Sequence, residues 1–198
     1  MKPTEELMKE HRVIERMLAV VSKAADRLEA GQEVDRDVFV GAVDFLKNFA
    51  DKCNHGKEEK LLFVKMVERG VSGEVGPIAV MLREHEDGRA HVRMIAELSA
   101  KEIEDRSRPD LVKHLKAHVS LLGQHIQKED KVLYQMANQI LTSDDQKDLA
   151  KGFQEVEEKV MGPGVHERHH HMIEELEKRF AWSLMAHFSI SCSEIRNL

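Results

Sequence analysis

Cysteine, proline and aromatic residues are scarce in this sequence, and each scarcity excludes a class of protein. The 198 residues include 2 Cys, 4 Pro, 1 Trp and 1 Tyr. Cys53 and Cys192 stand far apart without a CxxC partner, which argues against a disulfide framework and a thiolate zinc site. The shortage of aromatic residues argues against a β-sandwich. The composition therefore predicts an all-α protein.

Long apolar runs and basic blocks are also missing. No apolar stretch reaches the roughly 18 residues that a membrane-spanning helix needs, and the N-terminal sequence is too polar for a secretory signal. Charged residues of both signs are mixed along the chain, with a formal net charge of -6, so nothing resembles a nucleic-acid-binding surface. We expect a cytoplasmic protein with no membrane and no nucleic acid among its partners.

The apolar residues recur at helical spacing in several long segments. Four helices are predicted: over residues 4–30, between the turn at 31–37 and the loop at 70–77, over 77–105, and over 109–141. A capping box from Ser143 to Gln146 begins a shorter fifth helix, and Gly-Pro-Gly at 162–164 separates it from a sixth. These patterns predict an up-down four-helix bundle over residues 1–141, a helical extension over 142–180, and a tail or docked helix end over 181–198.

Histidine, in contrast, is abundant, with 12 residues. Some of them lie on the apolar seams, the faces of the predicted helices that carry the regularly spaced apolar residues. His11 and His85 take core positions on the first and third helices. His-x-x-x-Glu occurs twice, and because positions i and i+4 share one face of a helix, each phrase points an imidazole and a carboxylate the same way. The two phrases are His55 with Glu59 on the second helix and His125 with Glu129 on the fourth.

The second helix needs an irregularity to fit this scheme. Its early stripe, Phe39 to Cys53, lies nearly opposite His55 and Glu59 at 100° per residue. Asn54 and Gly56 are poor residues for a helix interior, so we predict a bulge, kink or break near residues 53–57.

Two seam glutamates need positive charge, because an ionised carboxylate is almost never buried without a partner. Arg89 on the third helix is one possible source, but it is a single charge facing two carboxylates and four imidazoles. Two divalent ions supply the remainder, with Glu59 and Glu129 bridging them and His11, His55, His85 and His125 as terminal ligands.

Several phrases of the chain resemble the hemerythrin-like family of His-His-Glu cation-binding bundles. They are EHRVIE at 10–15, CNHGKEEKLLF at 53–63, GPIAVMLREHEDGR at 76–89 and HIQKEDKVLY at 125–134. The resemblance implies a non-heme centre of two iron ions with an oxo or hydroxo bridge, and O₂ as a ligand. It also implies that the same four histidines and two glutamates bind the metal.

One position departs from the oxygen carriers of that family, which have a second histidine four residues after the first on the third helix. This chain has Arg89 there. We therefore expect an open coordination position, a water, or a recruited carboxylate such as Glu86. Arg89 itself either pairs with a ligand carboxylate or faces the open position. His118 lies about 10 Å along the helix from His125 and suits packing around the site, while the run His169 to His171 is expected on a solvated face.

Three functions fit these observations. The first is a di-iron protein that reacts with O₂ or a related diatomic, in oxygen, redox or iron sensing, storage or protection. The second is a di-iron enzyme that turns over peroxide or nitric oxide, or repairs iron sites. The third is a structural bundle with zinc or mixed metals that binds another protein, whose identity the sequence does not reveal.

Overall fold

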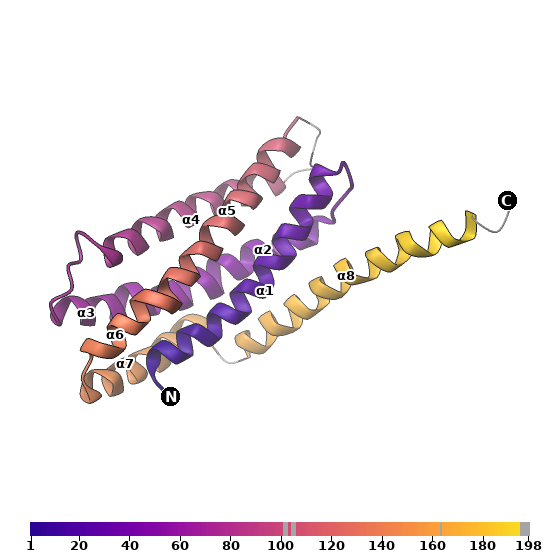
Figure 1. The fold of residues 1–198 in the computed structure, drawn as a ribbon. Helices are drawn as coiled ribbons and strands as arrows, with labels where there is room; N and C mark the ends of the chain where they lie inside the picture. Colours follow the sequence, from indigo (N-terminus) through magenta and orange to yellow (C-terminus); the bar gives the residue numbers. More distant parts are fainter. Residues whose placement is uncertain (101–102, 104–105, 163, 195–198) are drawn as a thin grey trace.

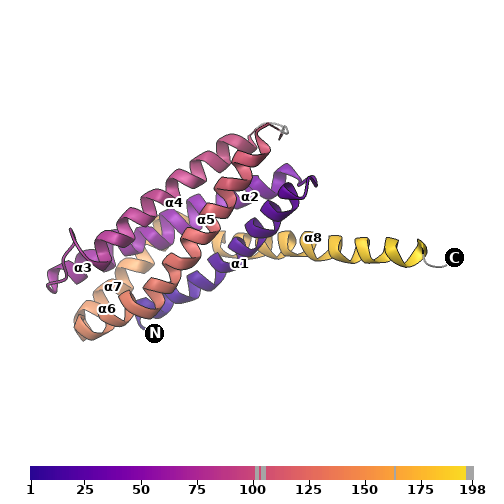
Figure 2. The same cartoon turned by 45° about the horizontal axis from the view of Figure 1, so that its top comes forward.

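Antiparallel helical rods form the body of the molecule (Figures 1 and 2), and the elements up to residue 140 divide into four of them. The computed structural model describes residues 1–100, 103, 106–162 and 164–194. The first rod is α1 (Pro3–Glu29), and the third is α4 (Pro77–Ser99). The second rod joins α2 (Arg36–Phe45), η1 (Leu46–His55), η2 (Glu58–Leu62) and α3 (Phe63–Glu68). The fourth joins α5 (Arg108–Lys128), η3 (Glu129–Leu133) and α6 (Tyr134–Ile140). The all-α bundle predicted from the sequence is confirmed.

The ends of the rods follow the local sequence. Pro3 and Pro77 stand in the first turns of their helices, where the missing amide hydrogen costs nothing. Gly31 and Gly70 follow α1 and α3 with positive φ angles, which glycine adopts without strain. Thr4, at the start of the predicted first helix, lies within α1, and its hydroxyl donates to the amide oxygen of Asn138.

Three π-helical segments, η1, η2 and η3, interrupt the second and fourth rods. Each widening of the helix adds residues to a turn and so rotates the following side chains relative to a regular α-helix. This rotation lets Phe39 and His55, which a regular helix would place on opposite faces, both point into the bundle. The irregularity predicted near residues 53–57 is confirmed, although it is longer than expected.

The extension after residue 141 consists of α7 (Ser143–Val156), η4 (Glu157–Met161) and α8 (Val165–Glu194). The cap of α7 is Thr142, one residue earlier than predicted, in a capping box with Asp145. Helix α8 packs against α1 and α2 through Ile173, Leu176 and Phe180. His169, expected on a solvated face, is buried there against Phe45 and Phe49.

The segment after residue 180 continues α8 as far as Glu194, and residues 195–198 lie outside the described part of the chain. Of the helices within the described ranges, none combines the length and apolar character needed to cross a membrane.

Two apolar clusters fill the bundle, one toward each end. The first contains Ile14, Cys53, Val92 and Leu122, among others. The second contains Leu7, Leu62, Met81 and Leu133 on the same four rods. On every rod, the histidines and glutamates of interest lie between a residue of one cluster and a residue of the other. The fold thus places a layer of polar side chains between two apolar clusters.

Candidate metal centre

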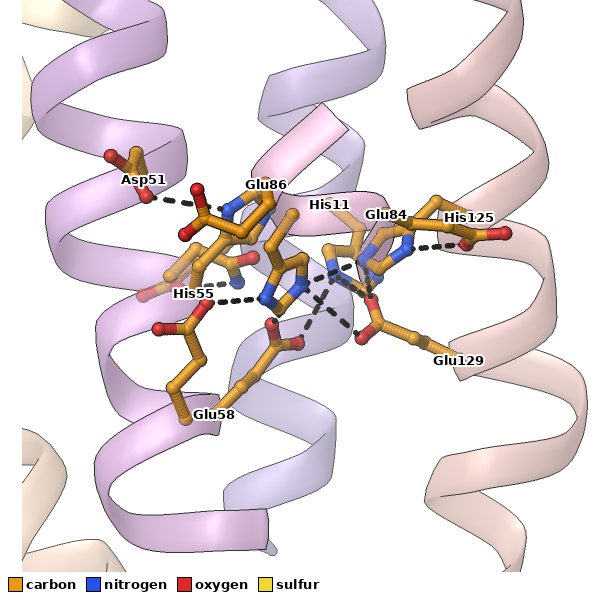
Figure 3. Close-up of polar contacts among 12 residues, drawn as sticks. His11, Asp51, His55, Glu58, Glu84, Glu86, His125 and Glu129 are labelled. Atoms are coloured by element: carbon orange, nitrogen blue, oxygen red, sulfur yellow. Dashed lines mark hydrogen bonds and ion pairs between the residues drawn. The ribbon is translucent and has the colours of Figure 1, made fainter. Parts of the chain in front are cut away.

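The polar layer gathers four histidines and two glutamates, and each of the four rods contributes to it. The close-up in Figure 3 shows His11, His55, Glu58, His125 and Glu129 directed toward one another at the centre of the bundle. All six residues are buried; they are listed here with their helices: His11 of α1, His55 of η1, Glu58 of η2, His85 of α4, His125 of α5 and Glu129 of η3.

The ring nitrogens of His85 and His125 face each other in an arrangement that a bound cation would stabilise. Their Nε2 atoms are 3.0 Å apart, while each Nδ1 lies within hydrogen-bond distance of a carboxylate oxygen. A carboxylate only accepts hydrogen bonds, so each Nδ1 carries a hydrogen, and when both rings are neutral each Nε2 turns a lone pair toward the other. Two lone pairs at this distance repel unless positive charge lies beside them. Two imidazoles on one ion, bound at about 2.05 Å and at right angles, would stand about 2.9 Å apart.

A second group forms around His11. Its Nε2 lies 3.4 Å from Oε2 of Glu129 and 3.8 Å from Oε1 of Glu58. The other oxygen of Glu58, Oε2, lies 3.4 Å from Nε2 of His85. Ligand atoms of His55, Glu58, His85 and His125 fall within 4.8 Å of one another, as do those of His11, Glu58 and Glu129. Glu58 belongs to both groups, so the two sets of potential metal ligands adjoin each other and share this carboxylate.

An outer ring of carboxylates fixes three of the histidines. Nδ1 of His11 donates to Asp130 at 2.8 Å, Nδ1 of His85 to Glu59 at 2.6 Å, and Nδ1 of His125 to Glu84 at 2.9 Å. Such contacts fix the tautomer and the direction of a metal-binding imidazole.

Each carboxylate of the outer ring is paired in turn with a cation. Asp130 pairs with Arg12, Glu59 with Arg89, and Glu84 with Lys128. Basic side chains therefore compensate the negative charges of the outer carboxylates. The two inner carboxylates, Glu58 and Glu129, would still require positive charge when ionised.

The pKa shifts of the inner residues follow from burial and crowding. Burial, reinforced by Glu129, raises the pKa of Glu58 well above its usual value. Burial also lowers the pKa of His85 and, with the neighbouring imidazoles, that of His55 well below the usual range. For His125, burial is outweighed by Glu129, which raises the pKa. A metal cation would stabilise ionised carboxylates and neutral imidazoles together, which are the forms that bind metal.

His55 completes the larger group without any fixed hydrogen bond. Its ring stacks on that of His85, with centroids 3.8 Å apart, and Asp51 lies 3.7 Å from its Nδ1. Within the described chain, neither of its buried ring nitrogens has a hydrogen-bond partner, and the same holds for Oε2 of Glu58 and both oxygens of Glu129. Buried polar atoms of this kind are uncommon in folded proteins. They are the donor atoms that a bound cation would satisfy, so the residues present fit a metal.

One predicted ligand has to be corrected. The sequence pattern named Glu59 as the carboxylate that shares a face with His55, but the structure places Glu58 in the layer and Glu59 outside it, against His85 and Arg89. The spacing of four residues assumes a regular α-helix, and the rod is π-helical on both sides of this position. The adjacent pair Glu58–Glu59 and the expected irregularity were the signals that could have indicated the alternative.

Tyr134 is a site residue that the sequence pattern missed. Its hydroxyl donates to Oε1 of Glu58 and lies 3.2 Å from Nε2 of His11, and the side chain is fully buried. Burial, together with Glu129 and Glu58, raises its pKa well above the usual value, so the phenol is neutral. Its position follows from η3, which rotates Tyr134 inward and leaves Val132, which a regular helix would place on the face of Glu129, 56% exposed.

The three residues expected around the site take different places. Arg89 shows the ion-pair arrangement, donating to Asp51 at 2.8 Å and to Glu59 at 2.7 Å. Glu86 is an exposed partner of Arg89 and does not reach the layer. His118 is buried but stands away from both groups of ligand atoms.

A separate buried cluster lies on the other side of the second rod. Lys57 is fully buried, and its Nζ donates to Glu6 at 2.9 Å, Glu10 at 2.6 Å and Glu157 at 2.7 Å. Cys53 lies beside it, with a pKa raised to about 12 by burial and by Glu10. The ammonium group of Lys57 already supplies positive charge to these carboxylates, so we interpret the cluster as a buried ion-pair network.

Comparison with known proteins gives a family match over the part of the chain that holds these residues. A family model described as the hemerythrin HHE cation binding domain matches residues 2–137, which hold the whole polar layer. Uncharacterized proteins of Mycobacterium bovis and Mycobacterium tuberculosis are each 23% identical over 160 residues, covering 80% of this chain and 62% of theirs. This chain thus matches less than two thirds of their length. No solved structure matches the chain.

Proposed function

Because the chain belongs to the hemerythrin HHE cation-binding family, we propose that its polar layer holds two iron ions and that the protein reacts with O₂ or a related small diatomic. His55, His85 and His125 would hold one ion, His11 and Glu129 the other, and Glu58 would reach both. The roles that suit such a protein are the sensing of oxygen or redox state, iron storage, and protection.

The observation that supports metal binding most strongly is the 3.0 Å approach of the Nε2 atoms of His85 and His125, whose Nδ1 atoms are both held by carboxylates. Imidazole and carboxylate donors without thiolate suit iron, and a core position between bundle helices is where such sites are built. The four imidazoles and two inner carboxylates form a set of potential metal ligands that is richer in nitrogen than a set made of carboxylates alone.

The protein's own groups would control what the metal can do. Bound ferrous iron would supply electrons to a diatomic such as O₂. Tyr134 holds one oxygen of Glu58, and the outer carboxylates keep the hydrogens of His11, His85 and His125 on Nδ1. The apolar clusters on either side exclude bulk water from the layer, and this exclusion strengthens every charge interaction inside it.

A second candidate function is turnover of peroxide or nitric oxide. It is supported by the unequal division of ligands, since three imidazoles serve one position and His11 alone serves the other. A position with fewer protein ligands leaves more room for an exchangeable small molecule. Reversible binding and turnover differ in whether the small molecule is consumed.

Anaerobic purification with metal analysis, followed by absorption spectra before and after air, tests both candidates. About two irons per chain, with near-ultraviolet and visible bands that appear with O₂ and reverse on its removal, is the expected result. Consumption of peroxide or nitric oxide by the loaded protein would support the second candidate instead. Stoichiometric zinc without iron, in protein expressed with ample iron, would contradict both.

A further inference from the structure

A cavity of about 650 Å³ lies beside the polar layer, walled by α2 with η1, by α4 and by α5. Its volume is in the range of sites that bind small organic molecules. On α4 the lining runs from Glu84 to Ala100, which at 1.5 Å per residue is roughly 24 Å. An elongated molecule would fit such a space, whereas a diatomic needs far less.

The two ends of the cavity differ in chemistry. The walls run antiparallel, because His55 stacks on His85 while Asp51, one turn earlier, bonds Arg89, one turn later. The end at this level is polar and includes His55 of the metal layer. The opposite end is lined by the apolar side chains of Phe39, Val40, Val43 and Ala96, together with Arg36 and Ser99. The cavity therefore matches a molecule with one polar end and one apolar end.

His118 forms part of the cavity floor and gives an independent sign of a ligand. Its ring is 3% exposed, and neither ring nitrogen has a hydrogen-bond partner among the described residues. Gly88 faces it from α4, where an added Cβ would lie 3.8 Å from Cε1 of His118. The absence of a side chain at Gly88 leaves space beside the ring of His118 that an alanine methyl group would fill at ordinary contact distance.

The charge around the opening favours an anion. Arg36, Lys47, Lys52 and Arg93 line the cavity and are exposed. Of the acidic lining residues, Asp51 is bound to Arg89 and Glu84 to Lys128. The third, Asp44, has no lysine or arginine partner within the described part of the chain and contacts Asn48 and His169.

We propose that this cavity binds a single-chain amphipathic carboxylate, with its hydrocarbon tail at the apolar end and its carboxylate beside His118 and Lys52. The imidazole of His118 would donate to a carboxylate oxygen, and the carboxylate end of the ligand would be the end nearer the metal layer. This site extends the proposed function from diatomics to an organic molecule held against the same layer.

Calorimetric titration with decanoate and decanol tests the proposal directly. Decanoate is expected to bind one per chain, at least tenfold more tightly than decanol. Ala96→Phe would fill the tail end and weaken decanoate binding more than tenfold, whereas Ala90→Phe, the same change at an exposed position of α4, would leave binding unchanged. His118→Leu would weaken decanoate binding several-fold and leave decanol binding close to wild type.

Several outcomes would overturn the site. They are the absence of saturable heat with decanoate, equal affinity for decanol and decanoate, or wild-type affinity in Ala96→Phe. Circular dichroism checks that each variant folds, and Ala96→Leu replaces Ala96→Phe if the larger side chain is not tolerated. Because the heat of binding is measured without any reaction at the metal, its failure is distinct from a failure of the iron proposal.

Discussion

At the scale of single residues, two neighbouring glutamates approach His85 from different sides and have separate tasks. Glu58 is fully buried between both groups of ligand atoms, while Glu59 anchors Nδ1 of His85 from outside and is itself held by Arg89. Sequence reasoning brought His11, His85, His125 and Glu129 to one layer from their seam positions alone. It missed Glu58 because a choice between adjacent residues depends on local helix geometry, which periodicity does not resolve.

The two glutamates are expected to respond differently to the same substitution. Glu58→Gln removes the carboxylate shared by both positions, so bound iron should fall from about two per chain to one or none. Glu59→Gln leaves the inner ligands in place and should weaken metal affinity by about 10- to 100-fold, the usual effect of losing the carboxylate behind a histidine. Metal analysis after dialysis at limiting free iron would measure both. Equal iron content in the two variants would contradict the assignment.

At the scale of elements, the π-helical segments decide which side chains reach the centre. Without η1 and η2, the apolar stripe ending at Cys53 and the ligands from His55 onward could not share the bundle interior. The conflict between the two stripes was visible in the sequence and predicted an irregularity. The matching rotation at η3 gave no such conflict, because Val132 and Met136 continued the pattern as plausible apolar residues, and so Tyr134 was missed.

Restoring a regular helix should therefore remove the metal site without unfolding the rods. Deleting Lys47, an exposed residue of η1, would rotate the following residues by about 100° relative to the preceding ones. We expect near-native helix content by circular dichroism, with most of the metal lost. Deleting Glu74 in the exposed loop before α4 is the matched control and should keep its metal. Full metal content in the Lys47 deletion would show that the π-helical register is dispensable.

At the scale of the whole molecule, the C-terminal helices are tied to the bundle by charged groups as well as apolar ones. Lys57 joins Glu6 and Glu10 of α1 to Glu157 of η4, and Arg16 forms two hydrogen bonds with Glu177 of α8. Periodicity predicted that these helices exist, but it could not tell where they dock. Their docking depends on contacts between residues 100 or more positions apart.

Lys57→Met tests this attachment. Removing the cation takes positive charge away from the buried carboxylate of Glu10 and should cost about 3 kcal/mol. This is the low end of the roughly 3 to 5 kcal/mol typical of a broken buried ion pair, because Glu6 and Glu157 are partly exposed. Chemical denaturation would measure the loss, with exposed Lys60→Met as a control expected within about 0.5 kcal/mol of wild type.

The ion pairs of Lys57 also predict how the stability of the protein depends on pH. The carboxylates around Lys57 outweigh its burial and raise its pKa above the usual 10.5. The stabilisation is therefore complete below pH 10.5 and is lost only as the pH rises further toward the raised pKa of the folded state. The difference between wild type and Lys57→Met should be constant from about pH 6 to about pH 9. A difference that declines across this interval would contradict the ion-pair network.

Anomalous diffraction from crystals of iron-loaded protein, recorded at the iron absorption edge, tests the central claim most directly. Two peaks are expected, one among His55, His85 and His125 and the other beside His11 and Glu129, with the Glu58 carboxylate between them. A single peak, peaks away from this layer, or coordination by Glu59 in place of Glu58 would contradict the account.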